Sequence, residues 1–200
     1  ADTREFTDRD GIDPTRADGP YDRVACDVIG LVDPGNGDDS VSISGGTKIS
    51  EGLVMGNGDD SLTMTSGQIS GGAHLGNGDD VVRLSGAAKI DTLITGNDDD
   101  TVDLSQSAKV GILSTGNDDD TVTIGGRIEV DMACLGNGDD RITLAHGANV
   151  DLVDGELGFD TLNVTGGDFR VDWLNDDPAT GEGHVVYLKA DGTETGERTA

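Results

Sequence analysis

An acidic five-residue turn, GNGDD or GNDDD, returns along this chain at a nearly constant interval. Six intact copies lie at Gly35–Asp39, Gly56–Asp60, Gly76–Asp80, Gly96–Asp100, Gly116–Asp120 and Gly136–Asp140, and a degenerate seventh copy ends at Asp160. The final aspartates are 21 residues apart once and 20 residues apart thereafter. Self-similarity at a fixed period of about 20 to 50 residues is typical of solenoid proteins. Because a 20-residue unit is too short for two helices, each unit is predicted to form one coil of β structure.

Apolar residues recur in register with this turn. Two places after each final aspartate stand Val41, Leu62, Val82, Val102, Val122, Ile142 and Leu162, and four places after it stand Ile43, Met64, Leu84, Leu104, Ile124, Leu144 and Val164. Polar residues separate the two columns, which is the period-2 pattern of a strand with one buried face. Ten to thirteen places on, a second apolar set follows: Ile49, Ile69, Ala73, Ile90, Leu93, Val110, Leu113, Val130, Ala133, Val150 and Val153.

These patterns predict an all-β, right-handed parallel β-roll or β-solenoid of about seven coils, roughly 30 Å long at about 4.8 Å per coil. Each coil should hold two short strands joined by two tight corners. Solenoids need distinct ends because an uncovered terminal coil is an exposed strand edge. We therefore expect an N-terminal tail or cap over residues 1–24, a roll over 25–165 and a strand-rich C-terminal cap over 166–200, with a strand at His184–Leu188.

Charge and composition limit the function. The formal net charge is −27, aromatic residues make up 3% of the chain, and glycine accounts for 32 of 200 residues. Without the repeat, such a chain would be predicted to be disordered, because it buries too little apolar surface. The acidity disfavours binding to nucleic acid or to anionic membranes, and no apolar run approaches the length of a membrane-spanning helix. We expect a monomer without membrane insertion.

The two cysteines, Cys26 and Cys134, should be free thiols. In a straight stack they lie about five coils, or roughly 24 Å, apart. A disulfide requires Cα atoms within about 7 Å of each other.

The turn itself has the chemistry of a cation site. Its glycines leave backbone carbonyls uncovered, and its final aspartate brings a carboxylate to the edge where one coil meets the next. Ca²⁺ prefers six to eight such oxygens at about 2.3–2.6 Å. Without a cation, the stacked carboxylates would repel one another. With one Ca²⁺ in each gap, seven turns make six gaps, and the charge of −27 becomes −27 + 12 = −15.

The stretches GNGDDSVSI, GNGDDSLTM, GNGDDVVRL and GNGDDRITL resemble the RTX (hemolysin-type) nonapeptide G-G-x-G-x-D-x-U-x from its second place onward. Over residues 34–165 the chain is similar to the calcium-binding parallel β-rolls of secreted bacterial proteins. In that family, adjacent turns share each ion through turn carbonyls and sixth-place aspartates. The resemblance implies these metal-site residues: Gly35, Gly37, Asp39, Gly56, Asn57, Gly58, Asp60, Gly76, Asn77, Gly78, Asp80, Gly96, Asn97, Asp98, Asp100, Gly116, Asn117, Asp118, Asp120, Gly136, Asn137, Gly138, Asp140, Gly158 and Asp160.

The chain departs from the family pattern in three ways. The first glycine is replaced by Pro34, Met55, Leu75, Thr95, Thr115 and Leu135, which are expected to point into the core. Only one edge of each coil carries the motif, so about six ions should line one edge, as in a one-sided variant of the roll. At Asp98 and Asp118 the fourth-place glycine is an aspartate, which we expect to add a ligand or an outer-shell contact.

The function expected from this resemblance is a calcium-dependent folding module of a secreted RTX-type protein, exported through a leaderless type I route. An alternative is a surface-recognition module for mineral, glycan or ice that uses the outward Asn and Asp ladders. An enzyme is not expected, because the three histidines are scattered and no acid, base and cation side chains converge in the sequence.

Overall fold

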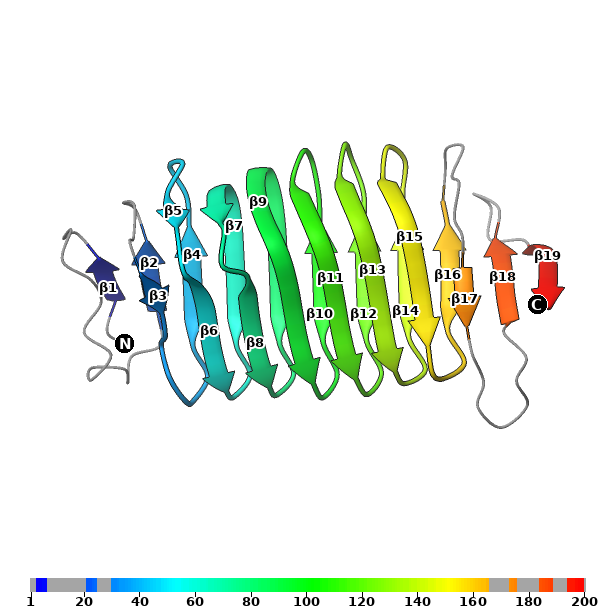
Figure 1. The fold of residues 1–200 in the computed structure, drawn as a ribbon, viewed down its shortest axis with the longest axis horizontal. Helices are drawn as coiled ribbons and strands as arrows, with labels where there is room; N and C mark the ends of the chain where they lie inside the picture. The colour runs from blue at the N-terminus through cyan, green and yellow to red at the C-terminus, as the bar shows by residue number, and fades with distance from the viewer. Residues whose placement is uncertain are drawn as a thin grey trace.

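The structure, a computed structural model, describes residues 30–165 with their side chains. It also describes the backbone of the strands at 3–6, 21–24, 173–175, 184–188 and 194–199. Within these residues the chain is all β, and no helix is long and apolar enough to cross a membrane. The rungs stand side by side in a row (Figure 1), which confirms a parallel β-solenoid of about seven turns.

The strands of the described segments alternate between two rows. The first row holds β2 (Tyr21–Val24), β4 (Ser40–Ile43), β7 (Ser61–Ile69), β10 (Thr101–Leu104), β12 (Thr121–Ile124), β14 (Arg141–Leu144) and β16 (Thr161–Val164). The second row holds β3 (Leu31–Val32), β6 (Gly52–Asn57), β8 (Ala73–Asn77), β11 (Lys109–Asn117), β13 (Glu129–Asn137), β15 (Asn149–Glu156) and β17 (Trp173–Asn175). The remaining strands are β1 (Thr3–Phe6), β5 (Lys48–Ile49), β9 (Val81–Asn97), β18 (His184–Leu188) and β19 (Glu194–Thr199).

Neighbouring coils pair in parallel and in register. Val82 of β9 pairs with Val102 of β10, which in turn pairs with Val122 of β12, so equivalent residues stack in columns. The expectation of two separate strands in every coil is wrong for β9, which runs through the corner as one strand of 17 residues. Between Met64 and Ser66 the register of β7 against β9 shifts by one residue, because Met64 pairs with Leu84 and Ser66 with Ala87.

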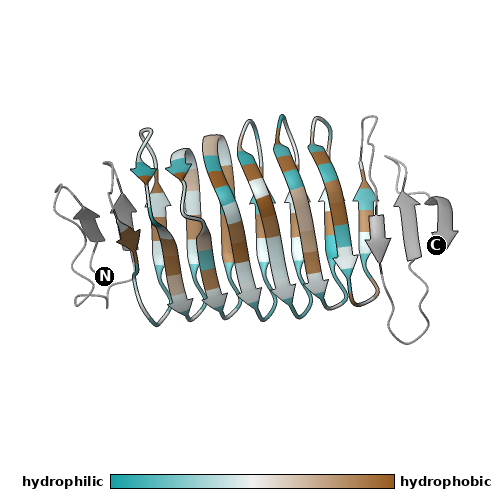
Figure 2. Cartoon of the chain, in the orientation of Figure 1, coloured by the Kyte–Doolittle hydropathy of each residue, from teal (hydrophilic) through white to brown (hydrophobic). Residues whose placement is uncertain are grey.

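The core is a narrow aliphatic column between the two rows, with hydrophobic residues along the strands and hydrophilic residues at the turns (Figure 2). Both predicted apolar sets are buried, apart from Val164, which is partly buried against the core. Small residues that the pattern did not single out also lie in the core, at Ala88 and Ala108 beside Ile128. Removing this apolar surface from water is the main favourable term for folding.

The end segments contain described strands. β1 and β2 lie within residues 1–24, and β2 pairs in parallel with β4. The predicted strand at His184–Leu188 is β18, which pairs antiparallel with β19. The roles of 1–24 and 166–200 as caps stay predictions. Cys134 is a free thiol, as expected, whereas Cys26 lies outside the described residues.

Stacked glycines allow the turns to approach closely. A Cβ atom at Gly76 would lie 1.8 Å from the carbonyl oxygen of Gly56 in the coil before it, and the φ angle at Gly76 is 125°. A Cβ atom at Gly45, where φ is 71°, would meet nothing beyond its chain neighbours within 4 Å.

We therefore expect Gly76→Ala to be far more destabilising than Gly45→Ala. The Gly45 change costs only left-handed strain, about 1–2 kcal/mol, while the Gly76 change also forces two backbones apart. The midpoint of urea unfolding measures both losses. Equal losses would contradict the close stacking of the turns.

Candidate functional site

The turn edge of the roll gathers the predicted site residues into columns. If the residue before each turn is counted as place one and the turn as places two to six, the first-place residues point into the core as expected. Met55, Leu75, Thr95, Thr115 and Leu135 are all fully buried. The sixth-place aspartates lie directly behind the turn and are only 1–8% exposed.

Each sixth-place carboxylate is tied to the preceding coil. Oδ1 of Asp80 accepts a hydrogen bond from the backbone N–H of Asp60 at 2.7 Å, and Oδ1 of Asp100 accepts one from Asp80 at 2.8 Å. The same bond recurs at 2.7–3.0 Å along the whole column from Asp39 to Asp160. The column of buried carboxylates is therefore built into the repeat itself.

The second carboxylate oxygen is left without a hydrogen bond. Among the described residues, Oδ2 is buried and unpaired in Asp60, Asp80, Asp100, Asp120, Asp140 and Asp160. A buried polar atom without a partner costs roughly 1–3 kcal/mol, and more when it is charged. Burial raises the pKa of these aspartates: that of Asp60, Asp100 and Asp140 to about 6, and that of Asp80, Asp120 and Asp160 to about 7.

The carboxylates form a line and not a cluster. In the part of the chain that the structure describes, no three His, Cys, Asp or Glu side chains converge on one point. A cation between two turns would therefore need backbone oxygens as well. The second-place carbonyls of Gly56, Gly76 and Gly96 face the next coil so closely that only glycine fits there.

Two further ladders cover the outside of the edge. Each fifth-place carboxylate accepts a hydrogen bond from the backbone N–H of the next coil, as Asp79 does from Asp99 at 3.2 Å. Third-place asparagines donate from Nδ2 to Oδ1 of the asparagine before them, as Asn97 does to Asn77 at 2.5 Å. Both ladders are exposed, and the aspartate ladder ends at Phe159, whose N–H bonds Asp139.

The fourth-place aspartates are strained, as their replacement of glycine predicts. The φ angles of Asp98 and Asp118 are 75° and 72°, and left-handed residues other than glycine cost on the order of 1–2 kcal/mol. Oδ2 of Asp98 accepts a hydrogen bond from the Gly78 N–H at 3.1 Å.

Sequence reasoning noticed Thr95 and Thr115 only as core residues, yet both bring buried hydroxyls to the turn edge. Oγ1 of Thr95 donates to the Thr115 carbonyl at 3.0 Å, and Oγ1 of Thr115 donates to the Leu135 carbonyl at 2.6 Å. In the sequence, these two threonines stand directly before the two GNDDD turns, and this coincidence could have indicated that they belong to the turn edge.

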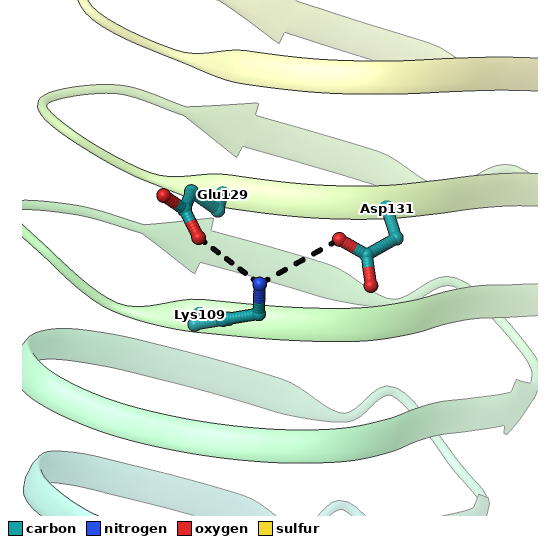
Figure 3. A network of polar contacts seen from close by, with 3 residues as sticks. All are labelled: Lys109, Glu129 and Asp131. Carbon is teal, nitrogen blue, oxygen red and sulfur yellow. Dashed lines mark hydrogen bonds and ion pairs between the residues drawn. The ribbon is translucent and has the colours of Figure 1, made fainter.

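A different kind of polar contact links the coils on the outer face of β11 and β13. Lys109 reaches toward Glu129 and Asp131 of the next coil (Figure 3), with Nζ 3.0 Å from Glu129 Oε2 and 3.8 Å from Asp131 Oδ1. A pocket of about 510 Å³ lies there beside Lys89 and Gly111. Because the ion pair is exposed, it contributes little to stability.

The chain matches no protein-family model, no curated protein and no solved structure.

The raised pKa values predict how stability depends on pH when no divalent cation is present. A carboxyl group with a folded-state pKa above its unfolded value of 3.8 favours folding most below about pH 4. It loses that contribution as the pH rises through about 6 to 7. Metal-stripped protein should therefore keep more of its far-UV circular dichroism β signal at pH 4.5 than at pH 7.5.

General charge repulsion in a −27 chain acts in the same direction. The matched pair Asp80→Asn and Asp79→Asn separates the two effects, since each removes one charge from the same turn. The buried substitution should flatten the pH profile more than the exposed one, and equal profiles would contradict the burial effect.

Proposed function

We propose that this chain is a calcium-dependent structural module in which Ca²⁺ lies between successive acidic turns. The observation that carries the proposal is the column of buried, unpaired Oδ2 atoms from Asp60 to Asp160. Backbone N–H donors satisfy Oδ1, whereas Oδ2 has no hydrogen-bond partner. The hydroxyls of Thr95 and Thr115 lower the pKa of the Asp100 and Asp120 carboxyls, but burial still raises both pKa values overall. A cation bound along this column would offset the repulsion between neighbouring carboxylates and the cost of burying their charge.

The donor set favours a hard cation. The acidic turns offer carboxylate and carbonyl oxygens, which suit Ca²⁺, and no histidine or cysteine of the described segment stands within an acidic turn. Ca²⁺ tolerates irregular coordination by six to eight oxygens, whereas Mg²⁺ demands a small octahedral site. The residues that would hold the ions are the sixth-place aspartates, with turn carbonyls from both flanking coils.

The free energy of binding would be comparable with that of folding. With a dissociation constant typical of extracellular modules, free Ca²⁺ at ten times that constant contributes roughly 1.4 kcal/mol per site. Six sites give about 8 kcal/mol, which equals the whole stability of an ordinary domain. Calcium would thus decide whether the roll forms.

This dependence suits a secreted protein. At the sub-micromolar calcium of a cell interior the acidic chain would stay extended, and it would fold after export into a calcium-rich medium. Secretion by a leaderless type I route, as in RTX-type proteins, is part of this proposal, as is a monomeric state without catalytic activity of its own.

A second candidate is recognition of a mineral, glycan or ice surface. The observation in its favour is the outer asparagine ladder, in which side-chain amides from Asn57 to Asn137 are hydrogen-bonded into one regular row. Charged aspartates beside this row suit mineral or glycan better than ice. Adsorption to calcite and to polysaccharide, together with thermal hysteresis, would detect such binding.

Removal of calcium should unfold the chain at neutral pH. Metal-stripped protein at pH 7.5 is expected to lose most of its far-UV β signal, because the buried carboxylates then repel one another. Millimolar calcium should restore the signal and equal magnesium should not. A full β signal without calcium, or equal rescue by magnesium, would overturn the proposal.

A matched pair of variants tests the site within the same titration. Asp80→Asn with Asp120→Asn removes two buried carboxylates, whereas Asp79→Asn with Asp119→Asn removes two exposed ones. The first pair should shift the calcium midpoint upward by about tenfold or more, and the second by less than about threefold, since a tenfold change in affinity is 1.4 kcal/mol.

A further inference from the structure

The six gaps between turns are not equivalent. The turns at Gly96–Asp100 and Gly116–Asp120 differ from all the others in two places at once: each has a buried threonine in the first place and an aspartate in the fourth. These two turns are consecutive, so the differences fall together at the centre of the roll.

The hydrogen bond to the third-place carbonyl also changes at the centre. In the first two gaps that carbonyl accepts a hydrogen bond from the fourth-place glycine of the preceding coil. Gly37 N–H donates to Asn57 O at 2.6 Å, and Gly58 N–H donates to Asn77 O at 2.8 Å. The last gap repeats the bond at 2.8 Å, from Gly138 to Leu157.

At the third gap this bond is weakened. The distance from Gly78 N to Asn97 O lengthens to 3.3 Å, and the same N–H is shared with Oδ2 of Asp98 at 3.1 Å. The Asp98 carboxylate therefore draws the donor away from the Asn97 carbonyl.

At the fourth and fifth gaps the bond is lost. Within the described segment 30–165, no backbone hydrogen bond joins Asp98 N to Asn117 O, or Asp118 N to Asn137 O. The φ angles of Asp98 and Asp118 are 75° and 72°, against 104–145° for the fourth-place glycines, so the backbone of these two turns has a different conformation. The carbonyls of Asn117 and Asn137 thus lack the hydrogen bond that the outer gaps have.

The same gaps contain the unpaired buried oxygens. Asp100, Asp120 and Asp140 are each 1% exposed, and each carries an Oδ2 atom without a hydrogen bond. The buried hydroxyls of Thr95 and Thr115 donate to backbone carbonyls of the next coil and also lower the pKa of the Asp100 and Asp120 carboxyls. The three central gaps thus combine buried carboxylates with a third-place carbonyl whose hydrogen bond is lengthened at the third gap and absent at the fourth and fifth. Two of the turns add a fourth-place carboxylate.

We propose that these three central gaps, from Gly76–Asp80 to Gly136–Asp140, form a class of high-affinity Ca²⁺ sites that fill first. The three outer gaps, whose third-place carbonyls are hydrogen-bonded, fill at higher calcium. The roll is therefore ordered from its centre outward. This inference rests on the proposed calcium function and adds an order of loading to it.

Calorimetric titration of the metal-stripped full chain with Ca²⁺ tests the two classes. We expect about three sites at least tenfold tighter than the remainder. Hydrogen exchange at intermediate calcium should show protection over residues 81–137 before it appears at 40–64 and 141–164. Six equal sites with simultaneous protection would overturn this inference alone, and absence of any calcium binding would overturn the proposed function as well.

Variants identify the cause of the difference. Asp98→Gly with Asp118→Gly restores the outer type of turn and relieves the left-handed strain, so it should fold at least as well in saturating calcium. It should abolish the tight class. The control, Asp99→Asn with Asp119→Asn, removes an equal number of negative charges from the same two turns and should retain the tight class. Equal weakening by both pairs would show that general charge alone grades the sites, which contradicts the proposal.

Discussion

The stacking of one buried carboxylate per coil is the constraint on which the rest of the structure depends. Parallel in-register pairing places equivalent residues above one another, so an acid in a turn becomes a column of acids. Backbone N–H groups satisfy one oxygen of each carboxylate, and the geometry leaves the other buried and unpaired. Such a column is unfavourable in isolation, and under the proposed function a bound cation would convert it into a connection between coils.

Adjacent aspartates in one turn act in opposite directions. Sixth-place carboxylates reach back to the preceding coil, whereas fifth-place carboxylates accept from the following one. Two hydrogen bonds to aspartate carboxylates therefore span each gap, one buried and one on the surface. Only the inner ladder is dehydrated, because the turn glycines let the chain pass over it without side chains. Burial, and not residue identity, separates a candidate ligand from a solvated surface charge.

Unequal gaps would give the roll a mechanism of assembly that identical repeats lack. A stack in which each coil contacts only its neighbours can nucleate anywhere and then propagate. Strained aspartates at Asp98 and Asp118 are unfavourable for the backbone, and such strain persists where it serves a site. Their position in the middle turns leaves coils on both sides to be added, so under this proposal order would spread in two directions from one region.

The sequence alone determined the period, the parallel β-solenoid class, the two apolar columns and the acidic edge, because each follows from residues spaced 20 apart and from strand alternation. It also placed Cys134 as a free thiol and β18 at His184–Leu188. Only the tertiary structure decided which carboxylate oxygens are paired, how β9 continues through a corner and where turn carbonyls are released. Those outcomes depend on the orientation of groups in adjacent coils, which a one-dimensional pattern does not specify.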